Sequence, residues 1–167
     1  MKKFLSLTMA LTMLGTALTG CGAKDAAAKT PVENTQQTAP VRQEQSQTEK
    51  ALALINTFAT GDTETARSLL ADGYIQHNLA YGTGADAFIG SVEYLASADV
   101  KTTVNNIRAF EDGDYVFLQT IYNFAGDGEQ VAFDIFRFDE NGKIAEHWDV
   151  METIADQSTW QNQNGKF

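Results

Sequence analysis

The sequence predicts an α+β domain, because its hydrophobic pattern changes from a helical period to a strand period along the chain. Between residues 48 and 96, apolar side chains recur at helical spacing, whereas residues 101–153 show the alternation that is typical of β-strands. Acidic turns that contain glycine, at 111–114 and 126–129, divide this second part. Helices first and an antiparallel meander afterwards indicate that the helices cover one face of the sheet.

Three helices are expected in the first half of the domain. They cover residues 48–60, 63–71 and 85–96, and each has an apolar stripe with helical spacing. Between the second and the third helix, residues 74–78 have the pattern of a short extended segment.

Four strands are expected in the second half, at 101–111, 115–125, 129–138 and 143–153. Several of them carry apolar side chains on both faces, although an antiparallel sheet with one solvated face should alternate more regularly. The pattern therefore predicts a curved sheet with the helices inside its curve and a second copy of the chain against its outer face, which would make the protein a homodimer.

The first 20 residues have the pattern of a bacterial secretory signal. Lys2 and Lys3 precede an apolar stretch, 4–18, that is too short to span a membrane as a helix. This stretch ends in Leu18-Thr19-Gly20-Cys21, which resembles the lipobox of bacterial lipoproteins. We therefore expect residues 1–20 to be a lipoprotein signal peptide and Cys21 to carry the lipid.

The rest of the chain divides into three parts. Residues 21–48 combine the lipidated cysteine with a tether that has too few large apolar side chains to fold, 49–153 form the domain, and 154–167 are a polar tail. The expected location is extracytoplasmic, with a lipid anchor in the bacterial membrane. Gly22, in place of an aspartate after the cysteine, favours the outer membrane if the organism has one.

The charge of the domain excludes one class of partner. Residues 49–167 hold 7 of the 12 basic residues and 19 of the 22 acidic residues, which gives this part a net charge of −12. No basic patch is available to displace the counterions of a phosphate backbone, so we expect no nucleic-acid partner. The acidity also disfavours electrostatic adhesion to anionic lipids, which leaves the lipid on Cys21 as the expected membrane contact.

The strongest functional signal is the segment 131–151, in which Asp134, His147 and Asp149 lie among aromatic and aliphatic residues. Burying an ionisable group is costly unless the group is paired or used. Three such groups in one apolar hairpin therefore indicate a site or a polar network. An aspartate beside an imidazole or a second carboxylate is a common arrangement for general acid/base catalysis.

The turn of this hairpin predicts how the three groups lie. Asn141-Gly142 is a strong turn signal, and counting back from it places Asp134 opposite His147, with Asp149 on the same face. A shift of two residues would pair Asp134 with Asp149 or Ala145 and keep this common face. A shift of one residue would separate the three side chains.

Two stretches resemble a known family: Tyr74-Ile75-Gln76-His77-Asn78, and the hairpin from Asp134-Ile135-Phe136-Arg137-Phe138 to Glu146-His147-Trp148-Asp149. Together with the order of elements over 49–153, they resemble the SnoaL-like group of the nuclear transport factor 2-like superfamily, which includes the polyketide cyclases. The resemblance implies a cone-shaped α+β barrel, in which a curved, four-stranded antiparallel sheet wraps around the three helices and a pocket opens at one end.

The resemblance also implies a function. The domain should bind a small, largely apolar molecule, with acid/base catalysis of the aldol, isomerase or dehydratase type that needs no cofactor. By the same resemblance Asp149 is the expected general base, assisted by His147 or Asp134. The residues expected to contact the ligand are Tyr74, His77 and Tyr122.

Three alternatives remain open at this point. His147 could be a structural histidine that Asp134 fixes by a hydrogen bond. The histidines and carboxylates could bind a metal, although a His-x-Asp spacing is common by chance, and we expect neither a metal nor a cofactor. Finally, the domain could be a non-catalytic module for ligand binding or protein interaction at the cell envelope, which the tether favours.

Overall fold

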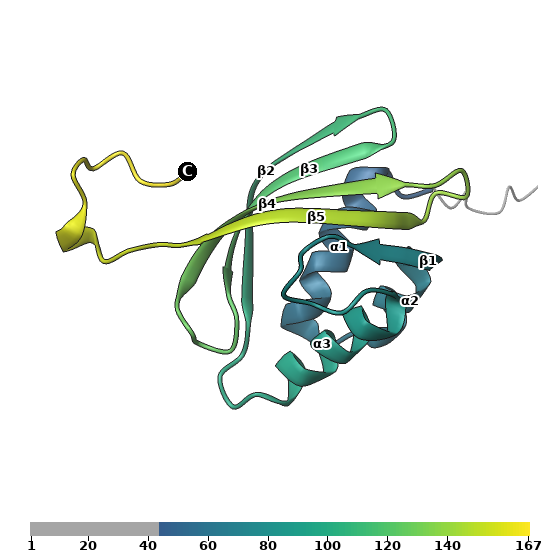
Figure 1. The fold of residues 1–167 in the computed structure, drawn as a ribbon, viewed down its shortest axis with the longest axis horizontal. Coiled ribbons are helices and arrows are strands. Elements are labelled where there is room, and N and C mark those ends of the chain that lie inside the picture. Colours follow the sequence, from purple (N-terminus) through teal and green to yellow (C-terminus); the bar gives the residue numbers. More distant parts are fainter. Residues whose placement is uncertain (1–43) are drawn as a thin grey trace, which may run out of the picture. The chain divides into compact units, whose positions relative to one another are not determined.

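Three α-helices and five strands follow one another in residues 44–167, the part of the chain that this computed structural model describes (Figure 1). The predicted signal peptide, Cys21 and most of the predicted tether lie outside the described residues. Within 44–167, none of the helices is both long enough and apolar enough to cross a membrane.

The first helix, α1 (Gln47–Thr60), has strong signals at both ends. The Ser46 hydroxyl accepts a hydrogen bond from the Glu49 backbone N–H (3.1 Å), and the Glu49 carboxylate accepts one from the Ser46 N–H (2.8 Å). This reciprocal capping satisfies two backbone donors that would otherwise have no partner. Gly61 ends the helix at φ +75°, a left-handed conformation that glycine adopts without steric cost.

The predicted extended segment is part of a fifth strand, which the sequence-based count of four strands missed. Helix α2 (Thr63–Leu69) is shorter than expected and passes directly into β1 (Leu70–Gln76). Strand β1 pairs in parallel with β5 (Ile144–Thr153) and has an irregular register between Leu70 and Ile75. Because the strand is short and irregular, its sequence lacks the regular alternation by which strands are recognised.

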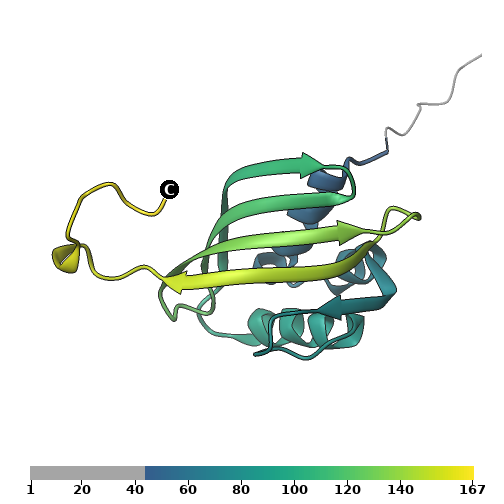
Figure 2. The ribbon, with the colours of Figure 1, turned by 45° about the horizontal axis from the view of Figure 1, so that its top comes forward.

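The other four strands form the expected antiparallel meander. These are β2 (Thr103–Asp112), β3 (Tyr115–Asn123), β4 (Glu129–Phe138) and β5, and the order across the sheet is β1-β5-β4-β3-β2. Figure 2 shows the long strands side by side, with the helices gathered on one face. The fold is therefore the α+β cone that the sequence predicted, with one more strand at its edge.

The hydrophobic core lies between the sheet and the helices, which include α3 (Ala85–Ser97). Leu54 of α1, Val92 of α3 and Phe136 of β4 all have no exposed surface. Burial of such side chains stabilises the fold by about 1.5–3 kcal/mol each. The core thus fixes the face of β4 that points toward the helices.

The hairpin between β4 and β5 pairs Asp134 with Asp149, two residues away from the register predicted by counting from the turn. Two irregularities add up to this shift. The turn is one residue shorter than expected, because the Asp139 N–H donates to the Lys143 carbonyl oxygen, and it contains Gly142 at φ +68°. Ala145 adds one bulged residue to β5. Because two shifts of one residue restore the alternation, His147 stays on the same face as both aspartates.

The outer face of the sheet carries a patch of large apolar side chains that are 39–73% exposed. Its members come from β2, β3, β4 and β5: Phe110, Tyr115, Phe117, Phe133 and Val150. The C-terminal tail, which contains a short 3₁₀ turn (Gln157–Thr159), returns to this face, because the Gln119 side-chain amide donates to the Lys166 carbonyl oxygen (2.8 Å). A patch of this kind is compatible with the predicted homodimer, which stays a prediction.

A dimer through this face should be sensitive to a charge placed in the patch. Static light scattering on residues 42–167 should report a dimer for the wild type and a monomer for Phe133→Asp, because an aspartate at this half-exposed position would be desolvated in the interface. The control variant Leu79→Asp changes an almost fully exposed side chain outside the sheet and should remain dimeric. A wild-type monomer at high concentration would contradict the homodimer.

Candidate functional site

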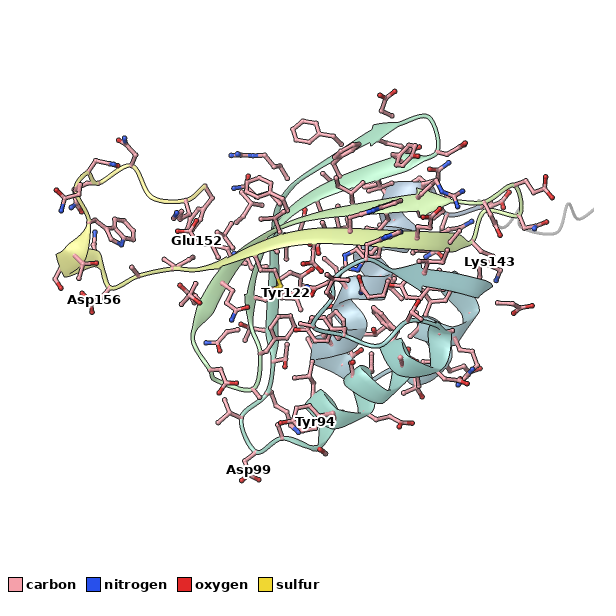
Figure 3. All side chains as sticks on the ribbon, viewed as in Figure 1. Tyr94, Asp99, Tyr122, Lys143, Glu152 and Asp156 are labelled. Carbon is pink, nitrogen blue, oxygen red and sulfur yellow. The ribbon has the colours of Figure 1, made fainter. Side chains whose placement is uncertain are left out.

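A cavity of about 470 Å³ lies between the inner face of the sheet and the helices. Figure 3 shows the side chains that project into this region, with Tyr122 of β3 among them. Most of the wall is aromatic or aliphatic, and one group of polar side chains comes from β5 and from its two neighbours in the sheet, β1 and β4. The aromatic wall residues that are buried or half-buried are Phe58, Tyr74, Phe88, Tyr122, Phe124 and Phe136.

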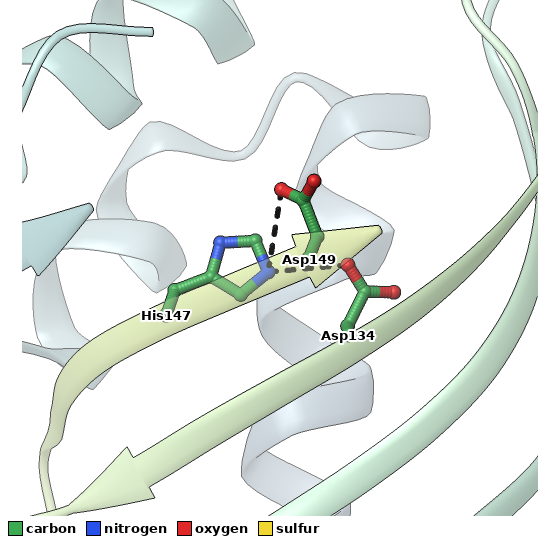
Figure 4. A group of neighbouring side chains, drawn as sticks. All are labelled: Asp134, His147 and Asp149. Atoms are coloured by element: carbon green, nitrogen blue, oxygen red, sulfur yellow. Dashed lines mark hydrogen bonds and ion pairs between the residues drawn. The ribbon is translucent and has the colours of Figure 1, made fainter. Parts of the chain in front are cut away.

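Asp134, His147 and Asp149 lie together at the polar end of this cavity (Figure 4). His147 Nε2 is 3.1 Å from Asp134 Oδ1 and 4.0 Å from Asp149 Oδ2. All three side chains are at least nine-tenths buried. The predicted common face is therefore the face that lines the cavity.

Asp134 accepts hydrogen bonds at both of its carboxylate oxygens. Tyr122 donates its hydroxyl to Oδ2 (2.9 Å), and His147 is the donor to Oδ1. Burial and the neighbouring Asp134 carboxylate raise the pKa of Tyr122 well above its ordinary value of 10, so this phenol keeps its proton at neutral pH. With both oxygens engaged, Asp134 is placed to orient His147 rather than to take a proton from a ligand.

The side-chain amide of Gln76 determines which nitrogen of His147 carries the proton. The backbone N–H of Asn78 donates to Gln76 Oε1 (2.9 Å), which turns Gln76 Nε2 toward His147 Nδ1 (3.0 Å) and the Tyr74 hydroxyl (3.3 Å). Because an amide nitrogen is only a donor, Nδ1 must accept. The proton of a neutral His147 is therefore on Nε2, which faces the two aspartates. The ring is held further by stacking on Phe136, with centroids 4.4 Å apart.

Asp149 is the carboxylate with an open oxygen. The side-chain amide of Asn78 donates to Asp149 Oδ1 (2.7 Å), and its own orientation is fixed because Asn78 Oδ1 accepts from the Ala80 N–H (3.0 Å). Asp149 Oδ2 has no hydrogen-bond donor among the residues that the structure describes. Burial raises the pKa of Asp149 above its usual value of 3.8, and the attraction of His147 and the hydrogen bond from Asn78 lower it by less.

Tyr74 completes the polar end of the cavity. Its hydroxyl oxygen accepts from Gln76, so its proton remains available for a ligand. Burial, followed by the two aspartates, raises the pKa of Tyr74 above its ordinary value of 10. The phenol is therefore a neutral hydrogen-bond donor at physiological pH.

His77, which the sequence analysis placed at the ligand, lies on the other face of the sheet and does not line the cavity. Its ring stacks on Trp148 (centroids 4.4 Å apart), and its Nε2 is 2.9 Å from Glu146, which also pairs with Arg137. Successive side chains of an extended segment point to opposite faces, so Gln76 rather than its neighbour reaches the site.

The same cluster has the residue types of a metal site. One ligand atom each from Asp134, His147 and Asp149 lie within 4.8 Å of one another. A metal bound at Nε2 of a neutral histidine requires the ring proton on Nδ1. The amide of Gln76 donates to that nitrogen, so the hydrogen bonds around His147 fit a proton on Nε2 better than a metal.

Sequence reasoning did not single out Gln76 and Asn78. Their signal was the extended segment itself, because alternation from Tyr74 places Gln76 on the same face. Neither side chain titrates, so neither was a candidate for acid/base chemistry. The role of an amide can be predicted only when the orientation of the neighbouring histidine is known.

The tautomer of His147 is testable by NMR. In the background His77→Asn, which leaves one histidine in the chain, imidazole ¹⁵N shifts at neutral pH should show Nε2 protonated. Adding Gln76→Glu places a carboxylate at Nδ1 and should move the proton to Nδ1 or charge the ring. An unchanged spectrum in Gln76→Glu would mean that Gln76 does not set the tautomer.

The open carboxylate should cost stability. Folding raises the pKa of Asp149, so the ionised carboxylate is less favourable in the folded protein than in the unfolded chain. This loss of stability begins as the pH rises above 3.8, the pKa in the unfolded chain. It is complete once the pH exceeds the pKa in the folded protein. Asp149→Asn should therefore increase the free energy of unfolding at pH 7, and the gain should disappear below pH 3.8. Denaturant titrations at several pH values measure it.

Glu152→Gln is the matched control for this measurement, because Glu152 is an exposed acid on the same strand. It should show no such gain. An Asp149→Asn variant that is less stable than the wild type at pH 7 would show that the carboxylate is structurally required.

Comparison with known proteins agrees with this fold. A sequence model described as the SnoaL-like domain matches residues 51–147. None of the curated proteins compared with the chain matches it.

Among solved structures, an NTF2-like protein of unknown function from Cytophaga hutchinsonii is 16% identical, with a TM-score of 0.57, covering 66% of this chain and 94% of that one. The LEH-like epoxide hydrolase of M. tuberculosis is 17% identical, with a TM-score of 0.56, and the alignment covers 64% of this chain and 82% of the hydrolase.

IdmH, a putative polyketide cyclase from Streptomyces antibioticus, is 19% identical, with a TM-score of 0.52, over 65% of this chain and 93% of the cyclase. At these identities the likeness to the three structures shows a shared fold. The sequence match from 51 to 147 covers more than half of the chain and includes all of β4, with Asp134, and the start of β5 as far as His147. The protein belongs to the SnoaL-like family.

Proposed function

We propose that the domain binds a small, largely apolar organic molecule in its cavity and moves a proton on it without a cofactor, with Asp149 as the general base. The observation that carries this proposal is the open Oδ2 of Asp149, a buried carboxylate with a raised pKa in an apolar cavity. Membership of the SnoaL-like family, and the likeness in fold to a polyketide cyclase, support ligand binding or cyclase-type chemistry.

The proposed step is proton transfer from a carbon next to a carbonyl group. Asp149 Oδ2 takes the proton, and the electron pair of the broken C–H bond moves toward the carbonyl oxygen, which becomes an enolate. The Tyr74 hydroxyl is the neutral donor in the cavity that could stabilise this oxygen. Return of the proton to another carbon completes an isomerisation. In an aldol closure the enolate carbon first attacks a second carbonyl carbon of the ligand, and Asp149 gives the proton to the alkoxide that forms. In a dehydration the enolate expels a β-hydroxyl group, which leaves as water with the proton from Asp149.

Asp134 and His147 support the base instead of acting as one. Each oxygen of Asp134 accepts one hydrogen bond, and the bond from His147 holds Nε2 at 4.0 Å from Asp149 Oδ2. His147 in this position favours the carboxylate form of Asp149, but burial outweighs it, so the pKa of Asp149 stays above its usual value. We propose further that the domain works outside the cytoplasm, tethered to a membrane through a lipid on Cys21.

A non-catalytic ligand-binding module at the cell envelope is the second candidate. It is favoured by the surroundings of His147, whose two ring nitrogens both have partners and whose ring is stacked on Phe136. Such a histidine could be purely structural, as could the network around it.

Exchange of substrate hydrogen with solvent tests the proposed step directly. Aryl ketones and β-diketones of a size that fits the cavity should incorporate deuterium next to the carbonyl in D₂O, as followed by ¹H NMR. Asp149→Asn should slow this exchange about 10²–10⁴-fold, because the amide cannot accept the proton. The wild-type rate should rise with pH through the raised pKa of Asp149 and then level off.

Glu152→Gln should exchange at the wild-type rate, because this exposed acid points away from the cavity. If Asp149→Asn exchanges as fast as the wild type, Asp149 is not the base. If compounds bind the wild type but none exchanges, the non-catalytic module is the better description.

A further inference from the structure

The charged side chains that line the cavity are all acidic. The residues that line the cavity include Asp127, Asp134 and Asp149 but no lysine or arginine. The one lining histidine, His147, accepts at Nδ1 from Gln76, an arrangement that a doubly protonated ring could not keep. The wall of the cavity therefore offers negative charge that is not balanced by a cationic side chain.

The rest of the wall is rich in aromatic faces. Phe58 is the centre of a cluster, with ring centroids 4.9 Å from Phe88 and 5.7 Å from Phe124, and Tyr122 stacks on Phe124 at 4.9 Å. Aromatic faces attract cations through their quadrupole, most strongly where water is excluded. Aromatic rings with a buried carboxylate are a combination that suits an organic cation.

Asp149 supplies the point of attachment for such a cation. Its side chain is 6% exposed, and its Oδ2 has no hydrogen-bond donor within the described part of the chain, whereas Oδ1 is held by Asn78. A carboxylate oxygen in a side chain that is 6% exposed is costly to leave without a donor. A ligand that brings both a positive charge and an N–H donor to this oxygen would remove that cost.

We propose that the natural ligand of the cavity is an amine: an apolar, ring-bearing body that fills the aromatic part, with a protonated amino group on Asp149. This inference rests on the proposed function only for the location of the ligand, because an ammonium group on Asp149 Oδ2 occupies the oxygen that would otherwise act as the base. The cavity of about 470 Å³ has room for an organic body besides the ammonium group.

Other classes of ligand match fewer of the groups that line the cavity. A neutral ketone would use the Tyr74 donor and would leave Asp149 unpaired until a reaction begins. An anionic ligand would face carboxylates without a cationic partner. A bare metal ion would need Nε2 of His147 without its proton, against the hydrogen bond from Gln76, and would leave the aromatic part empty.

Paired compounds test this proposal. The full-length protein is titrated with 2-phenylethylamine and 2-phenylethanol, and with the corresponding naphthyl pair, by isothermal calorimetry and by NMR of the cavity side chains. Each amine should bind about tenfold or more tightly than its alcohol, because a desolvated ion pair replaces a neutral hydrogen bond. Affinity for the amines should fall as the pH drops through the raised pKa of Asp149, and affinity for the alcohols should not.

Two variants locate the effect. Asp149→Asn should bind amine and alcohol about equally, whereas Glu152→Gln, on the outer face of the same strand, should keep the wild-type preference. The proposal is wrong if the alcohols bind as tightly as the amines, or if the preference survives in Asp149→Asn.

These outcomes separate this inference from the proposed function. Equal binding of both compound types in the cavity would reject the amine and leave a small-molecule site with Asp149 as its base. If neither type binds at millimolar concentration, the amine is rejected, and the deuterium exchange of ketones then decides the proposed function by itself.

Discussion

The hydrogen bond from the Gln76 amide to His147 is the interaction on which the chemistry of the cavity depends. It exists because β1 joins the sheet beside β5, which places Gln76 next to His147 in the parallel register. With Nδ1 occupied as an acceptor, the single proton of a neutral ring points at the two aspartates. The amide thus places the ring proton on the side of the carboxylates, and the distances from Nε2, 3.1 Å to Asp134 and 4.0 Å to Asp149, decide which carboxylate it binds.

Among the described residues, every carboxylate, imidazole and side-chain amide atom at the polar end of the cavity has a hydrogen-bond partner except one. Asp134, His147 and Asn78 all have partners that fix their orientation, and such networks are rigid when they are complete. Asp149 Oδ2 is the exception, and the raised pKa of Asp149 reflects the unfavourable burial of this charge. Functional sites commonly keep an unfavourable group of this kind, because the group that destabilises the folded protein is the one that reacts or binds.

The sequence predicted the fold and the central cluster because both depend on hydrophobic period. Asp134 and Asp149 share a face at any even register, so the site tolerated an error of two residues in the hairpin. The role of the segment after α2 could not be predicted in the same way. The sequence analysis selected His77 because histidines transfer protons, whereas alternation from Tyr74 places Gln76 in the cavity. The pairing of β1 with β5 shows that Gln76 lies beside His147.

Titration of the two carboxyl groups tests the central claim most directly. Side-chain ¹³C NMR of aspartate-labelled protein follows the protonation of each carboxyl separately, with Asp149→Asn and Asp134→Asn used to assign the two signals. The account predicts that the carboxyl carbon of Asp149 titrates at a pKa above its ordinary 3.8, since burial dominates its surroundings. A pKa of Asp149 at or below 3.8 would contradict the assignment of this residue as the open, reactive carboxylate.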